Sequence, residues 1–199
     1  MKRDVIEVPG ITSSFLSIEK DIERILTKLF FANQVHNRQL LRLLVIPMRD
    51  CLSNVTNPDY KEAIEKTTLA TLIKDGYVKL APKIPMPEHE KVKSYIIISF
   101  DNFTMNAENP QYRDCTIHFD IICHTDYWTM DDYQIRPLKI AGYIDGILNN
   151  TKLSGIGTLN FIGCNELVLD EVLSGYTLSY AAVHGTDDVL PSAHEWVEK

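Results

Sequence analysis

Apolar residues in the first third of the chain recur at steps of three and four, which is the spacing of one face of an α-helix. The first such stripe covers residues 15–30, and a leucine-rich stretch over residues 38–46 follows it. A third apolar pattern runs through residues 59–73 and stops at Gly76, a residue typical of helix ends. We therefore predict three helices within residues 1–76.

Beyond residue 77 the pattern changes to the alternation expected of β-strands. Prolines interrupt residues 78–88, which favours an extended connection or an edge strand. Residues 94–105 are β-rich, and residues 113–127 form the clearest strand. One face of that strand is predicted to carry Cys115, Ile117, Phe119, Ile121 and Cys123, and the other Thr116, His118, Asp120, Ile122 and His124.

The last part of the chain adds one helix and two strands. The helix is predicted over residues 135–150, and the strands over residues 159–169 and 175–183. The polar tail, residues 185–199, is expected to be loosely held. The predicted fold class is α+β, with an N-terminal helical region (1–76) followed by a body (77–199). That body is a mixed or antiparallel sheet of about four to five strands with one long helix packed on it, and we expect the two regions to form one compact unit.

Composition and charge exclude some classes of partner. The 199 residues are 45% hydrophobic, enough to fill a core. No apolar run approaches the roughly 20 residues that a membrane span needs, and the N-terminus lacks the apolar stretch of a secretory signal, so we expect no membrane partner. The net charge of −7 is concentrated in residues 77–199, where 17 acidic residues outnumber 9 basic ones. Nucleic-acid binding through this body is therefore disfavoured.

The four cysteines, Cys51, Cys115, Cys123 and Cys164, form no CxxC pair. A chain of this length does not need disulfide bonds to be stable. We expect reduced and mostly buried thiols, as in a protein made in a cytoplasm.

One group of residues has the character of a metal site. His118, Asp120 and His124 lie on one strand face, where neighbouring side chains are about 7 Å apart. A metal ion would need further ligands from elsewhere, and His-x-Asp is no specific signature. The alternative, which we favour, is that they are ordinary polar residues on a face that meets water or a partner.

Two further motifs have simpler explanations than ligand binding. Asp126, Asp131 and Asp132 surround an aromatic pair but lack the spacing of a calcium loop, so we interpret the segment as a solvated loop capping the next helix. The aromatic pair could equally form part of an intersubunit contact. Gly155 and Gly157 precede a strand rather than a helix, which predicts a turn and not a phosphate-binding loop.

The segment 37–44 contains four leucines and two arginines and could form a basic amphipathic helix at a membrane or nucleic acid. The surrounding region is nearly neutral, so we predict a helix that packs in the core. His184 closes a strand without a nearby nucleophile. We therefore predict no catalytic residues, no cofactor and no metal, and we interpret the chain as a non-catalytic assembly protein.

The arrangement of the body resembles the tail terminator (tail completion) proteins of long-tailed bacteriophages. The resemblance rests on the strand at 113–124, the helix at 136–148 and the paired strands that close on residues 175–180. It covers about half of the chain. Residues 39–44 are similar to the openings of phage neck and connector proteins, whereas the smallest tail terminators begin almost directly with the α+β body.

The resemblance implies a virion protein of the tail or neck, assembled in the host cytoplasm. Tail terminators form a ring, usually a hexamer, on the last ring of the tail tube, stop its polymerisation and dock on the filled head. The implied partners are other copies of the chain, the tail tube protein and head-completion proteins, with DNA passing through the lumen unbound. The alternatives are a head-closure or connector protein, a small metal-dependent enzyme and a ligand-binding α+β domain.

Overall fold

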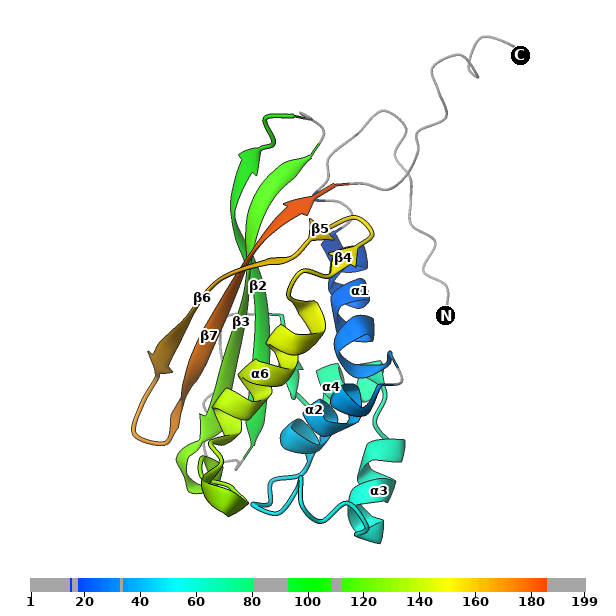
Figure 1. Ribbon diagram of the computed structural model, residues 1–199, viewed down its shortest axis with the longest axis vertical. Coiled ribbons are helices and arrows are strands. Elements are labelled where there is room, and N and C mark those ends of the chain that lie inside the picture. The colour runs from blue at the N-terminus through cyan, green and yellow to red at the C-terminus, as the bar shows by residue number, and fades with distance from the viewer. Residues whose placement is uncertain (1–14, 16–17, 33, 81–92, 109–111, 186–199) are drawn as a thin grey trace, which may run out of the picture.

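A mixed five-stranded sheet with helices on one face forms the protein (Figure 1). The computed structural model describes residues 15, 18–32, 34–80, 93–108 and 112–185. The helices are α1 (Ile18–Phe30), α2 (Val35–Val45), α3 (Pro58–Glu65), α4 (Leu69–Lys74) and α6 (Arg136–Leu148). The strands are β1 (Val78–Lys79), β2 (Ser94–Met105), β3 (Arg113–His124), β4 (Lys152–Leu153), β5 (Gly157–Thr158), β6 (Asn160–Val168) and β7 (Leu173–His184).

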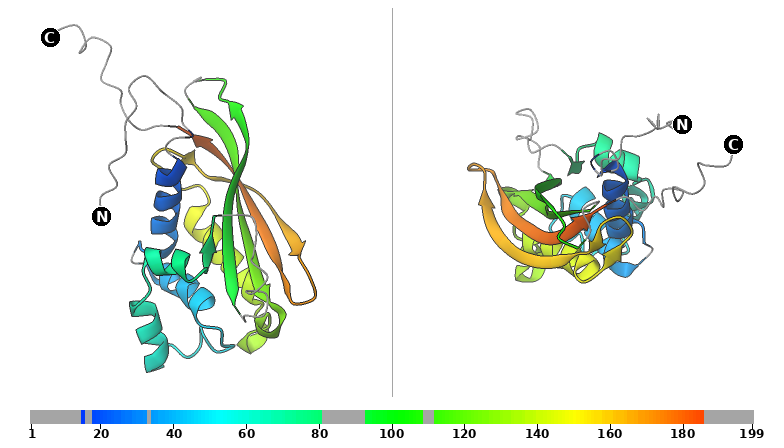
Figure 2. Two further views of the ribbon diagram at one scale, coloured as in Figure 1. Left: turned by 180° about the vertical axis from the view of Figure 1, so that it is seen from behind. Right: turned by 90° about the horizontal axis from the view of Figure 1, so that it is seen from above.

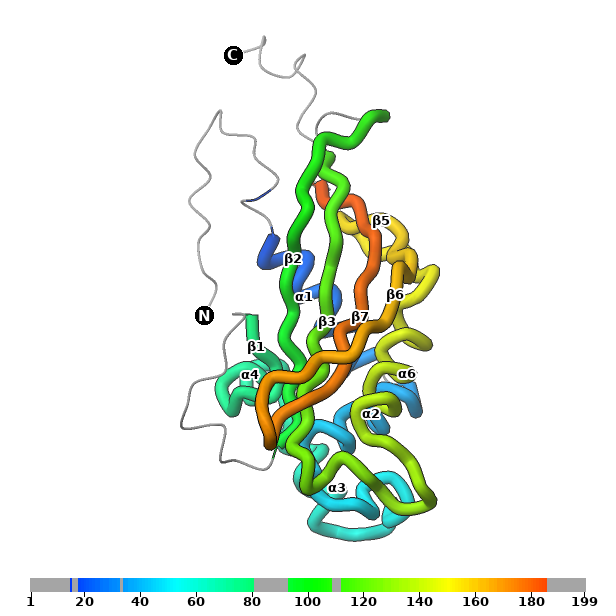
Figure 3. Tube along the Cα trace, turned by 90° about the vertical axis from the view of Figure 1, so that its left-hand side faces the viewer, coloured from blue at the N-terminus to red at the C-terminus, as the bar shows by residue number. Residues whose placement is uncertain are grey.

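The strand order of the main sheet is β1-β2-β3-β7-β6, and Figure 3 shows the last four of these strands side by side. β1 runs parallel to β2, whereas every other neighbouring pair is antiparallel. The short strands β4 and β5 form a separate two-stranded hairpin. The predicted α+β class, with a mixed sheet behind an N-terminal helical region, is confirmed.

The two faces of β3 differ as its alternating sequence predicts. Ile117, Phe119 and Ile121 are fully buried on the face that α6 covers, where they pack in the same apolar cluster as Ile140 and Ile144. The opposite face carries none of the described helices, and Figure 2, which views the sheet from behind, shows the strands in front of α6. β3 ends at His124 rather than at residue 127, because the chain turns there into a short 3-10 helix, Thr125–Tyr127.

The predicted third helix is two helices, and the prediction of one continuous element was wrong. Thr67 donates its hydroxyl back to the carbonyl oxygen of Ala63, and Thr68 begins α4 as an N-cap. Hydroxyl side chains compete for backbone groups in this way, and they favour helix ends over helix interiors. Gly76 follows α4 with a φ of 75°, the left-handed conformation that glycine adopts readily.

α2 is a core helix, as predicted for the leucine-rich segment. Its leucines are buried, and Arg42 also points inward, where it donates to the carbonyl oxygens of Cys51 and Val55. The inward direction of Arg42 leaves the predicted alternative, a basic membrane or nucleic-acid helix, without its basic face. No helix among the described residues combines the length and apolar character needed to cross a membrane.

Arg136 anchors the junction between α2 and α6. Its side chain is fully buried and donates to the carbonyl oxygens of Leu43 and Ile46, at 2.8 and 3.2 Å. Its Nε donates to the carbonyl oxygen of Tyr127 at 3.0 Å. The carbonyl groups at the C-terminal end of α2 carry partial negative charge, which favours a cation there. The apolar core accordingly contains residues of both the helical region and the sheet.

The remaining elements agree with the predicted order, and their bounds differ by a few residues. The helix expected over residues 135–150 is α6, and the two last strands are β6 and β7. The proline-interrupted stretch begins with the edge strand β1, but its residues 81–88 lie outside the described residues. Residues 186–199 of the predicted loose tail lie outside them as well.

Candidate assembly surface

The hairpin of β6 and β7 extends past the layer of helices (Figure 1). β6 pairs with β7 on one side and is the last strand of the sheet on the other. Seven of its nine residues are exposed, including Val168 at 67% and Ile162 at 57%. An edge strand with exposed apolar side chains and unpaired backbone groups is a template for pairing with another chain.

β6 lacks two of the features by which proteins usually protect such an edge, lysine and proline residues. Its sequence, Asn-Phe-Ile-Gly-Cys-Asn-Glu-Leu-Val, contains neither lysine nor proline and only one charged residue, Glu166. It does have an irregularity in its pairing with β7 between Phe161 and Gly163. Lysines and prolines normally help to prevent edge-to-edge association, so β6 is less protected against pairing with another chain than a strand that carries them.

A row of aromatic rings ties the exposed strand to the core. Phe161 of β6 packs edge-to-face on Tyr180 of β7, and Tyr180 packs in the same way on the buried Phe119 of β3, each pair with 5.8 Å between ring centroids. The Tyr180 hydroxyl donates to Asp145 of α6 at 2.9 Å. Burial and this hydrogen bond raise the pKa of Tyr180, so it stays protonated as a donor. The exposed edge is therefore fixed to rigid elements.

The face of the sheet without helices is polar and acidic. Asp101, Asp114 and Asp120 point to it, and none of the positions of β2, β3, β6 and β7 on this face is lysine or arginine. At its lower end Tyr95, Ile97, Ile122 and Leu173 form a small separate apolar cluster. A partner on the polar part of this face meets carboxylates and hydroxyl groups.

The predicted grouping of His118, Asp120 and His124 on one strand face is correct, but each of them bonds to a different residue. His118 bonds to Ser179 through Nδ1 at 2.8 Å, and its Nε2 lies 3.1 Å from a carboxylate oxygen of Asp101. Asp120 accepts a hydrogen bond from Thr177 at 2.7 Å. His124 accepts a hydrogen bond at Nδ1 from the backbone N–H of Asp126, at 3.2 Å. In the described part of the chain, no three His, Cys, Asp or Glu side chains are grouped as metal ligands would be.

The acidic loop before α6 is solvated as predicted, but its side chains do not cap the helix. Asp126, Asp131 and Asp132 are exposed, and Ile135 occupies the N-cap position without a side-chain hydrogen bond. Trp128 from the aromatic pair packs on Tyr176 of the same chain, with 6.3 Å between ring centroids. Its ring is therefore half-buried against β7 instead of standing free for a partner.

Gly155 lies in the turn between β4 and β5, and Gly157 is the first residue of β5, so the predicted turn is present within a hairpin instead of between a helix and a strand. Both have positive φ, at 78° and 75°. A side chain on Gly155 would collide with Arg24, since its Cβ would lie 2.1 Å from the guanidinium.

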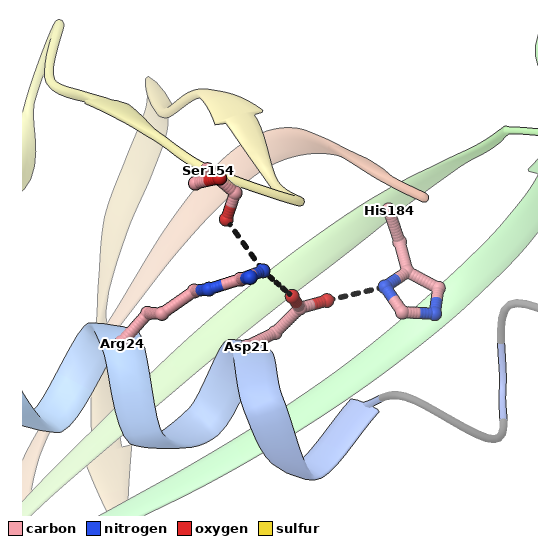
Figure 4. A network of polar contacts seen from close by, with 4 residues as sticks. All are labelled: Asp21, Arg24, Ser154 and His184. Carbon is pink, nitrogen blue, oxygen red and sulfur yellow. Dashed lines mark hydrogen bonds and ion pairs between the residues drawn. The ribbon is translucent and has the colours of Figure 1, made fainter. Parts of the chain in front are cut away.

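A buried polar network beside this turn was not predicted (Figure 4). Asp21 of α1 and His184 of β7 are 1% and 0% exposed, and His184 Nδ1 bonds to a carboxylate oxygen of Asp21. Arg24 lies 3.3 Å from the other carboxylate oxygen and donates to the carbonyl oxygen of Ser154 at 2.9 Å. The network joins α1, the β4–β5 hairpin and the end of β7. Asp21 and His184 are 163 positions apart, so no local pattern in the sequence could have paired them.

The cysteines divide between the core and the exposed strand. All four are free, and Cys51, Cys115 and Cys123 are buried, which agrees with the prediction of mostly buried thiols. Burial raises the pKa of Cys115 to about 12 and that of Cys123 to about 11. Cys164 is exposed on β6, where partial burial and the nearby Asp145 carboxylate raise its pKa to a lesser degree.

Comparison with known proteins gives one family. The model of the YomW family matches residues 37–182, which extend from α2 to β7 and cover most of the chain. Among curated proteins, none matches this chain.

Proposed function

The chain belongs to the YomW family of phage-associated proteins, and from this premise we propose that it is a structural virion protein that acts as a tail terminator. In this role, copies of the chain form a ring, with six as the expected number, on the end of the tail tube. The ring stops tube polymerisation and presents the surface that docks on the filled head. The protein acts in the tail or neck of the virion and assembles in the host cytoplasm.

The observation that carries the proposal is the exposed apolar edge strand β6 in a phage-associated protein. Large exposed apolar surfaces on a folded chain mark contacts with other proteins. The strand is held by the Phe161–Tyr180–Phe119 ring contacts, so it presents a fixed surface of the kind that a symmetric assembly repeats.

The acidic face of the sheet supports the proposal, because DNA has to pass through the ring without binding to it. In the proposed ring this face lines the lumen, with Asp101, Asp114 and Asp120 repeated around it. Carboxylates repel the phosphate backbone, so DNA would pass without being held. The partners of the ring are the tail tube protein on one side and head-completion proteins on the other.

We further propose that the chain is not an enzyme and needs no metal or cofactor. The polar residues with catalytic character are engaged in contacts that hold the fold together. His118 bonds to Ser179, Asp120 to Thr177, and His184 to the buried Asp21.

A head-closure or connector protein of the neck is the alternative function. It is favoured by the helical layer of α1 to α4, since the smallest tail terminators begin almost directly with the α+β body. Such a protein would bind on the head side instead of ending the tube.

Deleting the gene from the phage or prophage that encodes the chain separates the two functions. Loss of a tail terminator should give tubes of abnormal, mostly excessive length, because nothing stops polymerisation. Loss of a head-closure protein should give tails of normal length beside heads that leak DNA or stay unattached. Electron microscopy of lysates measures both, and complementation with the intact gene is the control. Normal virions from the deletion strain would contradict both functions.

A further inference from the structure

We infer that β6 of one copy pairs with residues 98–105 of β2 in the next copy, which no described strand covers on their outer side, so that the sheet continues from subunit to subunit. The inference rests on the proposed function, because it assumes that copies of the chain assemble into a ring. It names the two surfaces that meet and makes the contact head-to-tail.

The first surface is the outer edge of β6. All nine of its residues are exposed or half-buried, and it has neither lysine nor proline. On the side of the sheet that α6 occupies, Phe161 and Val168 are 44% and 67% exposed.

The second surface is the upper part of β2, at the opposite edge of the sheet. β1 pairs with only Ile96 and Ile97 of this strand. Within the described part of the chain, no other strand lies on the outer side of β2. Its exposed end carries Met105, which is 66% exposed and shares the helix side of the sheet with Phe161 and Val168.

The directions of the strands make these two edges compatible. β2, β3, β7 and β6 alternate in direction. In a head-to-tail ring whose axis is tilted from the strands, β6 therefore runs antiparallel to β2 of the next copy. The tilt is required because the pairing sets Phe161 level with Phe100 and Val168 level with Ser94, so β6 has to shift along its own length to meet residues 98–105. The antiparallel alternation continues across the junction, and apolar side chains on the helix side of both strands come into contact.

The charges permit the contact as well. The outer strand β6 carries one charged residue, Glu166, and residues 98–105 of β2 also carry one, Asp101. Glu166 lies on the helix side of the sheet and Asp101 on the opposite side. The two like charges are therefore separated by the sheet itself.

A complementation test with two variants examines the head-to-tail geometry. The first variant, Ile162→Lys with Val168→Lys, places charge on the β6 edge, and the second, Met105→Lys, places it on the β2 edge. These side chains are all more than half exposed, so each variant should fold. Val35→Lys is the matched control, since Val35 is 70% exposed at the start of α2, away from both edges. Circular dichroism and thermal melting check the fold of each.

Native mass spectrometry of the purified chains then measures assembly. The wild type and the Val35 control should form higher assemblies, and each edge variant alone should lose them. An equimolar mixture of the two edge variants should form mixed dimers, because one intact β6 edge meets one intact β2 edge. Assembly of Met105→Lys at the wild-type level would overturn the inference.

Cross-linking of Cys164 provides the second measurement. Cys164 lies at the middle of β6, so a symmetric β6–β6 contact would bring two copies of this thiol together, and a short bismaleimide would give cross-linked dimers. The head-to-tail contact predicts that such dimers are absent from wild-type assemblies. Their appearance as the main product would overturn the inference, as would a wild type that stays monomeric at every concentration. Tail length in the deletion strain tests the proposed function separately from all of these results.

Discussion

β3 and β6 belong to the same sheet, contain apolar residues and pair with β7, but the rest of their surroundings differs. β3 has a strand on each side and α6 across one face, so Ile117, Phe119 and Ile121 are fully buried. β6 has a strand on one side, and Phe161 and Val168 are exposed. The difference teaches that apolar strand residues serve two purposes here. On β3 they stabilise the fold, and on β6 they are available to a partner.

Removing a ring from β3 should have the largest effect on stability. Phe119→Ala deletes a fully buried side chain that contacts Tyr180. We expect it to lower the free energy of unfolding by about 3–5 kcal/mol, because the loss of apolar burial adds to the cost of a cavity. Urea unfolding monitored by circular dichroism measures this change. On β6, Val168→Ala should change the same quantity by no more than about 0.5 kcal/mol, and similar losses for both variants would break the contrast between the strands.

A variant of the buried Asp21–His184–Arg24 network tests whether polar contacts also hold the helices on the sheet. Asp21→Ala leaves His184 and Arg24 without the carboxylate that bonds to both. Removing the partner of a buried polar group costs about 1–3 kcal/mol, and urea unfolding should show a loss of that order. Glu23→Ala, an exposed acidic position on the same helix, is the control. Equal stability of the two variants would mean that the network contributes nothing.

Two glycines of α6 should give a smaller effect of the opposite sign. A Cβ atom at Gly142 or Gly146 would meet no atom within 4 Å. Each substitution by alanine should raise the free energy of unfolding by about 0.5–1 kcal/mol, since glycine is the weaker helix former. Gly175→Ala is the contrasting control in β7, because its Cβ would lie 1.6 Å from the carbonyl oxygen of Ile121, and it should destabilise the fold. Thermal unfolding measures all three variants.

Thiol labelling sharpens the comparison of the strands without a change in sequence. Cys115 and Cys123 lie buried on β3, where burial raises their pKa to about 12 and about 11, so at mildly alkaline pH both are protonated and inaccessible. Cys164 on β6 is exposed. Reaction with a chromogenic disulfide should modify one thiol per folded chain and all four in denaturant. Fast modification of two or more thiols in the folded state would contradict the burial of the β3 cysteines.

The long periodic elements of this fold were predictable because their signal is local. The alternation over β3 and the apolar stripe of α6 each repeat over a dozen or so residues, and the structure confirms both. The break between α3 and α4 was missed because two threonines outweigh an apolar pattern that otherwise continues. The two-residue strand β1 is too short to carry a pattern.

The candidate surface was only partly predictable, for a different reason. β6 was predicted as a strand, but its place at the edge depends on pairing with β7 and on nothing lying beyond it in the described sheet. The contact of Asp21 with His184 likewise arises only once the sheet has brought the two ends of the chain together. Such relationships are properties of the assembled fold and leave no mark in a short window of residues.

The guanidinium of Arg136 limits how this protein can be divided. Two of its hydrogen-bond acceptors, the carbonyl oxygens of Leu43 and Ile46, come from the chain before residue 50. A fragment without that segment would retain a cation in an apolar setting, stripped of its acceptors, at a cost of several kcal/mol. The N-terminal helices therefore cannot be exchanged or trimmed while the sheet stays intact. Fusion partners or tags are better joined at positions outside the helices and the sheet.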